Sequence, residues 1–572
     1  MIKYRNKLLL IASILPIFLL LVSSVLPYNI VDTDEISPDQ AIQQTNYGDI
    51  NGDGEEGKKV AVYGFSQGGN SVIDPQVLSF KPDMVIRAWN KWDTSGNKPR
   101  DFNFEYVKQC HDKNIIFIGG ITASVLFETE CASHEQLLDW ATRDASNNLV
   151  LHKGLNNFRG SMANPSYRQY LVDMGKIQID GGVDGIFYDE ADGAYFGADH
   201  SNNYENEGFD DYFCKDFNKY LMEKYPNYTK EDWKSKFKMT DDNIISKEYP
   251  YDDLQNNFNY RTYLAKHGWA NSPFTSVNPL ASVWGHQTVN RPENSDRDFR
   301  AKYMMIYWKD IVDSLREYAL TKYNKEILIT SNGIFPYVDF QSVGLYEYNN
   351  DHSGGEANYV PVKGDGHLDG SYSLIDDYIW LKERNQQIAG DNVPVVLFID
   401  WPTKIMNDYY ALPLEEKKDF WRIYGAESYA CGLYFAFHLK TSMPGEPTAK
   451  QSGIFDFLKE YSAFYKNNES VYNNSEFIKK LDINADNINA TLTRGHDGKT
   501  EYVHLINHNY DNSILTQKNI TLNVELEKKP VKVEILSPDY EECKLPDYSY
   551  EKGILTIKVD SLYSYDVVRI SK

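Results

Sequence analysis

The sequence predicts an α/β chain, with a (β/α)8 TIM barrel followed by an all-β sandwich domain. From residue 59 onward, eight short apolar runs alternate with helical segments. The runs are continuous in Val, Ile, Leu and Phe, which is typical of strands buried on both faces. After about residue 480 the pattern changes to short β-forming segments separated by Asn, Asp, Gly and Pro. Repeated strand–helix alternation favours a closed parallel barrel, and the later segments favour a β-sandwich.

The barrel is expected over residues 59–470 and the sandwich over 480–572. The predicted barrel strands are 60–65, 84–89, 115–120, 183–189, 327–332, 342–348, 393–400 and 431–437. Helical periodicity is clearest at 104–112, 167–179, 300–318 and 414–429. A long insertion rich in Tyr, Asn and Asp, at 193–300, is expected to overhang one side of the barrel mouth. A doubly wound open sheet is the alternative, but no GxGxxG or P-loop follows any strand.

The N-terminal segment 1–26 reads as a signal peptide or an uncleaved N-terminal anchor. Lys3, Arg5 and Lys7 precede a nearly continuous apolar stretch at 8–26. A stretch of about 19 residues lies on the border between a signal core and a spanning helix. The polar residues 27–58 are expected to form a flexible linker. The sequence therefore predicts a protein that is secreted, or tethered to the outer face of the cell membrane.

The composition of the chain indicates which ligands and modifications to expect. The net charge of −23 and the pI near 5.0 argue against nucleic acid, because phosphates would be repelled. The five cysteines form no CxxC pair and the 12 histidines form no HExxH, so a zinc site is not expected. Cleavage of a glycosidic bond by two carboxyl groups requires neither a metal nor an organic cofactor. One or two disulfides could form after export. Sequons that would make the chain a glycoprotein begin at Asn227, Asn468, Asn473, Asn489 and Asn519.

Polar side chains follow the carboxyl ends of six of the predicted strands, where a barrel places its active site. Acids, amides and tryptophans should therefore converge on one rim. In chain order they are Trp89, Asn90, Trp92, Asp189, Glu190, Asp192, Ser331, Asn332, Glu347, Asn349, Asp351, Asp400, Trp401 and His438.

This set suits cleavage of a glycosidic bond in a carbohydrate substrate. One carboxylic acid protonates the leaving oxygen, and a second carboxylate attacks the anomeric carbon or activates water. Asp189 and Glu190 are adjacent, so in a strand they point to opposite sides, and we favour Asp189 as the one facing the axis. Glu347 is favoured over Asp351 because it lies within the strand-like run. Asp184 precedes the buried half of its strand and is expected to form a cap or salt bridge near the barrel bottom.

Two other readings of the chain stay open. A catalytically inactive barrel that binds glycans or builds a cell envelope would show the same pattern without a competent carboxyl pair. A serine hydrolase is suggested by Gly64-Phe65-Ser66-Gln67-Gly68, which fits GxSxG after the first strand. Asp74-Pro75 follows closely and leaves little room for the helix that such a nucleophile needs.

The stretch ANPSYRQYLVDMGKIQIDGGVDGIFYDEAD, at 163–192, resembles the fourth-strand region of barrel glycosidases. It is similar to the group that includes α-galactosidases, α-glucosidases and dextranases. In that group an acid ending the fourth strand is the nucleophile and one ending the sixth is the acid/base. The resemblance therefore implies Asp189 as nucleophile and Glu347 or Asp351 as acid/base. The C-terminal part of the chain, with YVHLINHNYDN, is similar to the sandwiches that follow dextranase-like barrels.

Overall fold

The computed structural model divides the chain into two units, Met1–Gln43 and Gln44–Lys572. The structure describes residues 63–66, 79–86, 104–152, 157–189, 207–285, 298–332, 336–344, 373–389, 393–398, 409–440 and 450–572. The signal or anchor segment and the linker lie outside these residues. No helix in the described parts of the chain is long and apolar enough to cross a membrane.

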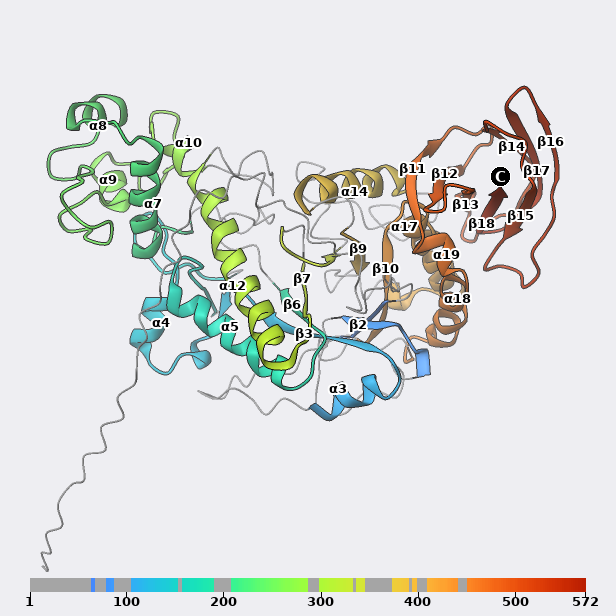
Figure 1. Ribbon diagram of the computed structural model, residues 1–572, viewed down its shortest axis with the longest axis horizontal. Helices are drawn as coiled ribbons and strands as arrows, with labels where there is room; N and C mark the ends of the chain where they lie inside the picture. Colours follow the sequence, from blue (N-terminus) through green and yellow to red (C-terminus); the bar gives the residue numbers. More distant parts are fainter. Residues whose placement is uncertain are drawn as a thin grey trace, which may run out of the picture. The chain divides into compact units, whose positions relative to one another are not determined.

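The centre of the molecule is an eight-stranded sheet (Figure 1). Its strand order is β7-β6-β3-β2-β1-β10-β9-β8, and every neighbouring pair is parallel. A further parallel bridge joins Asn332, directly after β7, to Ser342 of β8. The bounds are β1 Tyr63–Ser66, β2 Met84–Ile86, β3 Ile116–Thr122, β6 Gly185–Asp189, β7 Leu328–Ser331, β8 Gln341–Gly344, β9 Val395–Phe398 and β10 Tyr434–Lys440.

Each of the eight predicted apolar runs contains or overlaps one of these strands, which confirms their assignment. The expectation of a helix after every strand is wrong between β7 and β8. Residues 332–340 alone join these two strands, and no helix is present among those of them that the structure describes. Parallel crossovers usually take a dozen or more residues, so this connection is too short to fold a helix. Instead Asp339 turns back beside β7, where its carboxylate accepts the Ile329 amide.

Helices flank the sheet, and their ends follow from local sequence. The helix α5 (Pro165–Asp180) begins with Pro165 at its first turn, after Asn164 as N-cap. The helix α12 (Phe299–Tyr323) is capped by Asp298 and ends at a left-handed Asn324. Figure 1 shows α5 and α12 side by side. The other helices of this region are α3 Phe104–His111, α4 His134–Trp140, α14 Ile375–Ala389, α16 Leu414–Phe420, the π-helical turn η4 Trp421–Gly425, α17 Ala426–Ala430, α18 Phe455–Asn467 and α19 Glu469–Tyr472.

The segment between β6 and β7 carries a small helical unit (Figure 1) whose aromatic residues belong to the same buried cluster as the parallel sheet. The Trp284 ring lies 4.8 Å from both Phe209 and Phe217, which come from different parts of the unit. Such ring pairs stabilise beyond the area that they bury. The Tyr307 hydroxyl on α12 donates to Asp216 and ties the unit to the sheet-flanking helices. Its helices are α7 Asp211–Lys224, α8 Lys230–Phe237, α9 Tyr260–Lys266 and α10 Ala281–Trp284.

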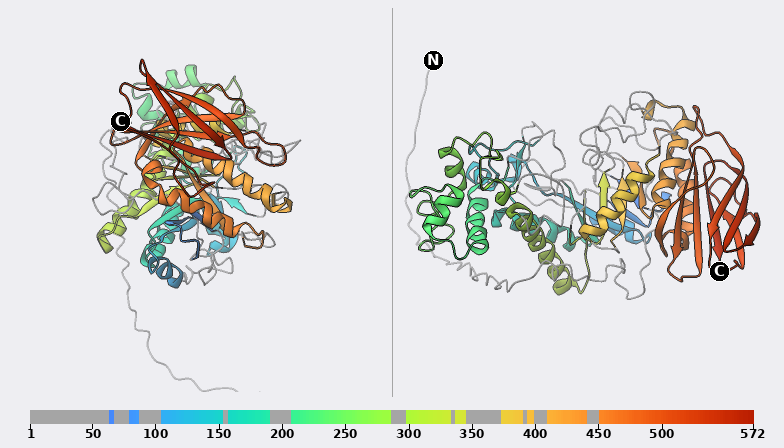
Figure 2. Two further views of the ribbon diagram at one scale, coloured as in Figure 1. Left: turned by 90° about the vertical axis from the view of Figure 1, so that its right-hand side faces the viewer. Right: turned by 90° about the horizontal axis from the view of Figure 1, so that it is seen from above.

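The C-terminal residues form two antiparallel sheets that share one hydrophobic core (Figure 2). The first has the order β11-β12-β13-β18-β15 and the second β14-β17-β16. Buried Val, Ile and Leu alternate with exposed polar residues along β14 and β17, as one-sided burial requires. The strands are β11 Ser475–Leu481, β12 Ile488–Gly495, β13 Thr500–Asn507, β14 Gln517–Glu525, β15 Lys532–Leu536, β16 Asp547–Glu551, β17 Ile554–Leu562 and β18 Tyr565–Ser571.

This all-β part is joined to the preceding helices by buried polar contacts. The Thr491 hydroxyl donates to the Ala430 carbonyl at 2.6 Å. His508 lies 2.9 Å from Glu427, and both side chains are almost completely buried. Tyr502, Ile506, Tyr565 and Val567 belong to the same apolar cluster as the parallel sheet. The two parts therefore share a core as well as a boundary.

Two expectations about modification meet the structure here. All five cysteines lie in described residues and are free, so the disulfides that export would permit are not present. The sequon residue Asn473 is buried and accepts a hydrogen bond from Tyr434, so its side chain is not accessible in the folded chain. Asn227 and Asn519 are exposed.

Candidate active site

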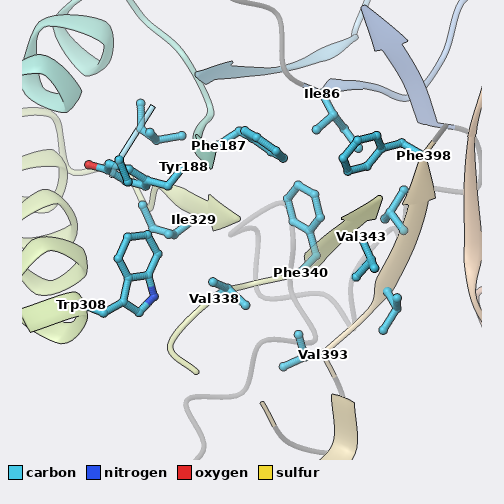
Figure 3. Close-up of a cluster of buried hydrophobic side chains, with 14 of the residues drawn as sticks. Ile86, Phe187, Tyr188, Trp308, Ile329, Val338, Phe340, Val343, Val393 and Phe398 are labelled. Atoms are coloured by element: carbon cyan, nitrogen blue, oxygen red, sulfur yellow. The ribbon is translucent and has the colours of Figure 1, made fainter. Parts of the chain in front are cut away.

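The two faces of the parallel sheet can be told apart from ring contacts. Phe187 of β6 and Phe398 of β9 lie 6.4 Å apart, although these strands are not neighbours in the sheet. Figure 3 shows both rings pointing toward a common centre. Tyr188 points the other way and packs against Trp308 of α12, with ring centroids 5.0 Å apart. The face with Phe187 is called the inner face below, and the face with Tyr188 the helix-covered face.

Asp189 is the last residue of β6 and, two residues after Phe187, belongs to the inner face. Thr122 of β3 lies opposite it in the strand register. Phe187 pairs with Thr330 of β7, so Asn332 occupies the next inner-face position on that neighbouring strand. Thr122, Asp189 and Asn332 are 8%, 7% and 8% exposed. Three adjacent strands thus bring a hydroxyl, a carboxylate and an amide to one end of the inner face.

A second polar layer lies next to the site on the inner face, two residues nearer the start of β7 than Asn332. Thr330 and Ser342 share a hydrogen bond of 3.2 Å between their hydroxyls. Because Asn332 bridges Ser342, β8 is joined to β7 at the level of the candidate site. The backbone carrying Asn332 is therefore held by main-chain and side-chain contacts together.

The opposite end of β6 has the structural acid that the sequence predicted. Asp184 accepts hydrogen bonds from His111 at 2.8 Å and from Lys325 at 2.7 Å. It also accepts the amide of Phe117. Burial alone would raise the pKa of Asp184, but these hydrogen bonds and the Lys325 charge lower it overall. The prediction that Asp184 forms a salt bridge away from the rim is confirmed.

Most other predicted rim residues lie outside the described residues. They are Trp89, Asn90, Trp92, Glu190, Asp192, Glu347, Asn349, Asp351, Asp400 and Trp401. His438 lies in β10 with its Cα opposite that of Phe65. Ser66 ends β1, and the described chain resumes only at residue 79, so the GxSxG reading is left as a prediction.

Sequence reasoning missed Thr122. The run IIFIGG was assigned as a strand without a polar group at its end, although Thr122 follows two residues later. The strand continues through it, and the register then sets it opposite Asp189. The sequence IGGITAS, in which a hydroxyl residue follows the apolar run, could have indicated a polar group at the end of this strand.

Sequence reasoning also missed a buried ion pair beside the rim. After β3, strand β4 (Val125–Leu126) pairs antiparallel with β5 (Phe158–Arg159), and α4 lies between them in the chain. Arg159 binds Glu207 through two hydrogen bonds, of 3.0 and 3.2 Å. Their side chains are 0% and 1% exposed. The pair joins the loop after β3 to the described chain that resumes at Glu207 after β6. The two charges are far apart in sequence, and nothing in their local sequence indicates burial.

No group of three His, Cys, Asp or Glu suited to a metal ion occurs in the described ranges. The site described so far consists of one carboxylate with neutral hydrogen-bonding neighbours. Such a group can act as a nucleophile or a general base.

No protein-family model and no curated protein sequence matches the chain. Among the solved structures that are similar to it are glycoside hydrolases and a glucanotransferase. One is a cycloisomaltooligosaccharide glucanotransferase from Paenibacillus sp., with 11% identity over 89% of this chain and 84% of that chain, at a TM-score of 0.49. Another is a maltogenic α-amylase from Thermotoga neapolitana, with 10% identity over 90% and 99% and a TM-score of 0.47. A third is an α-amylase from H. orenii, with 8% identity over 89% and 98% and a TM-score of 0.45. At these values the similarity identifies no substrate, linkage or catalytic residue in this chain.

Proposed function

We propose that this protein is a glycoside hydrolase, or a transglycosylase using the same residues, that acts on an extracellular poly- or oligosaccharide. The observation that carries the proposal is the position of Asp189. It ends a strand on the inner face, it is 7% exposed, and Thr122 and Asn332 flank it on the two adjacent strands. A buried carboxylate beside neutral hydrogen-bonding groups suits an oxocarbenium-like transition state, because the negative charge stabilises the developing positive charge.

We infer that the parallel sheet closes into an eight-stranded barrel of the (β/α)8 type, with no helix in the described residues between β7 and β8. The bridge from Asn332 to Ser342 and the hydrogen bond between Thr330 and Ser342 join the two strands at the ends of the sheet order. Phe187 and Phe398 meet across the inner face, which a closed sheet explains. In such a barrel the carboxyl ends of the strands form the rim where chemistry occurs.

In the proposed mechanism Asp189 is the nucleophile, or the base that activates water. Glu347, with Asp351 as the alternative, is the acid that protonates the leaving oxygen. The hydroxyl of Thr122 and the amide of Asn332 would hold sugar hydroxyls next to the reacting carbon. A carboxyl separation of about 5–5.5 Å would give retention, and about 6.5–9.5 Å inversion.

The decisive experiment is hydrolysis of a panel of α- and β-linked glycans by the parent, by Asp189→Asn and by Glu347→Gln. Both variants should lose activity by several orders of magnitude, because each removes a group that the reaction needs. Asp313→Asn is the matched control, since Asp313 lies exposed on α12 in an i,i+4 pair with Lys309. It should keep full activity.

Other outcomes would redirect the assignment. Full activity in Asp189→Asn refutes Asp189 and moves attention to Asp192 and Asp400. Glycan binding without cleavage by the parent favours the inactive glycan-binding or envelope protein. Labelling of Ser66 by an organophosphonate, with loss of an esterase activity, favours the serine hydrolase.

We also propose that the protein is exported through the segment 1–26. Its basic start and apolar stretch support this. N-terminal sequencing of protein from the medium and from the membrane fraction tests it: a new N-terminus near residue 26 supports cleavage, and an intact Met1 in the membrane fraction supports an anchor. Protein retained in the cytoplasm refutes export.

A further inference from the structure

Side-chain hydrogen bonds of Asn164 and Arg168, which precede and follow Tyr167, hold the start of α5 in place. The side chain of Asn164 accepts the Tyr167 amide at 3.4 Å, and its own amide donates to the Asp139 carbonyl at 2.8 Å. One turn on, Arg168 donates to the Met162 carbonyl at 2.7 Å. Asn164 is completely buried, so these bonds are shielded from water. Tyr167 therefore projects from a backbone that is held before and after it.

The side chain of Tyr167 is itself confined. Its ring packs near Trp140, with centroids 5.6 Å apart, and is 1% exposed. A Cβ added at Gly160 would fall 2.2 Å from the Tyr167 ring, so the glycine makes room for it. Burial raises the pKa of Tyr167 well above its usual value. Its hydroxyl is therefore a permanent hydrogen-bond donor at any pH at which the protein would work.

That donor is two hydrogen bonds away from the candidate site. The Tyr167 hydroxyl donates to the Ala123 carbonyl at 2.8 Å. The Ala123 amide in turn donates to the Asp189 carbonyl at 2.7 Å. Ala123 directly follows Thr122, the residue opposite Asp189 in the register. One residue of β3's end is thus bound on one side to α5 and on the other to Asp189.

We propose that Tyr167 is a positioning residue, which holds the end of β3 through Ala123 and thereby fixes the backbone of Asp189. Its consequence for catalysis rests on the proposed function, in which Asp189 is the reacting carboxylate. A carboxylate at the end of a strand moves with its backbone, and a displacement of about 1 Å can reduce a rate by roughly 100-fold. The Tyr167 hydroxyl would influence the reaction indirectly, through its hydrogen bond to Ala123, whose amide is bound to the Asp189 carbonyl.

The test is Tyr167→Phe, which removes the hydroxyl and keeps the ring. We expect kcat to fall by about 10- to 100-fold while KM stays within about twofold, because substrate contacts are unchanged. Tyr170→Phe is the matched control, since Tyr170 lies on the same helix and its hydroxyl donates to Glu130 at 3.0 Å. It should show the same small loss of thermal stability and the parental kcat. A parental kcat in Tyr167→Phe overturns the role in catalysis. An equal reduction of kcat in both variants also overturns it, because it shows a general loss of stability instead.

Amide hydrogen exchange of the intact protein separates this proposal from the proposed function. Tyr167→Phe should exchange faster than the parent in peptides covering 118–126, and Tyr170→Phe should not. Unchanged exchange in Tyr167→Phe overturns the positioning role whatever the activity. If the parent cleaves no glycan, or if Asp189→Asn stays fully active, the proposed function fails; faster exchange in Tyr167→Phe would still support the contact of Tyr167 with β3.

Discussion

Replacing Arg159 with Met leaves the carboxylate of Glu207 buried without its bidentate partner. Both side chains are almost fully buried, and two hydrogen bonds of 3.0 and 3.2 Å join them. Removing one member of such a pair typically costs about 3–5 kcal/mol, because the remaining charge keeps its desolvation penalty. For a cooperative unit of about 400 residues, the entropy of unfolding is roughly 0.8 kcal/mol per kelvin. The midpoint of thermal unfolding should therefore fall by about 5 °C.

Differential scanning calorimetry at pH 7.5 and pH 5 measures this effect. The Arg159 charge favours the ionised form of Glu207, so its removal should raise the pKa of this buried carboxyl. Stability that such a carboxyl contributes is present at low pH and lost as pH rises, so the deficit should be smaller at pH 5. The double variant Arg159→Met/Glu207→Leu should recover most of the loss, because no charge is then buried.

Lys309→Met is the matched control, since it breaks an exposed i,i+4 pair with Asp313 and should not shift the midpoint measurably. A shift below about 1 °C in Arg159→Met would refute the reasoning. The reasoning would also be refuted if the stability loss of the double variant equalled the sum of the losses of Arg159→Met and Glu207→Leu. The two residues would then not be coupled.

Two further predictions concern other parts of the fold. Burial raises the pKa of Asp566 to about 7, so the all-β part should lose stability as pH rises from about 4 to 7. Asp566→Asn should flatten that dependence in calorimetric scans, and an unchanged slope would contradict it. Gly160→Ala should cost about 1–3 kcal/mol, because its Cβ would overlap the Tyr167 ring. In Gly425→Ala the added Cβ meets only the Tyr465 hydroxyl at 3.9 Å, so this control should be neutral or slightly stabilising; equal midpoints in the two variants would contradict the overlap.

The strands could be predicted because burial on both faces leaves a direct record in composition. Between Asp184 and Asp189 the run contains only Gly, Ile, Phe and Tyr, and this pattern indicated both the strand and its rim acid. The choice of Asp189 over Glu190 came from the two-residue period of a strand, and the contact of Phe187 with Phe398 gives Asp189 its inner-face position. Its catalytic role stays a prediction.

What could not be predicted depends on contacts between distant segments. Arg159 and Glu207 read as ordinary surface charges, and only the fold brings them together in the interior. The fragment Asn164-Pro165-Ser166-Tyr167 could be read as a helix start, but the partner of the Tyr167 hydroxyl on β3 could not. The connection from β7 to β8 has no helix in its described residues, 332 and 336–340, because it is short. The assumption of a regular strand–helix repeat did not predict this.

The core shared between the parallel sheet and the C-terminal sheets has a consequence for biosynthesis. Tyr565 and Val567 of β18 belong to the cluster that contains the strands of the candidate site, and they follow the other buried members of this cluster in the sequence. When β1 to β10 have been synthesised, the nascent chain therefore still lacks some of the side chains that complete this core. Until β18 leaves the ribosome, the apolar residues that Tyr565 and Val567 cover in the folded chain stay exposed and prone to aggregation. Premature termination anywhere before β18 would leave that surface uncovered, and so would an expression plasmid that stops at the apparent domain boundary.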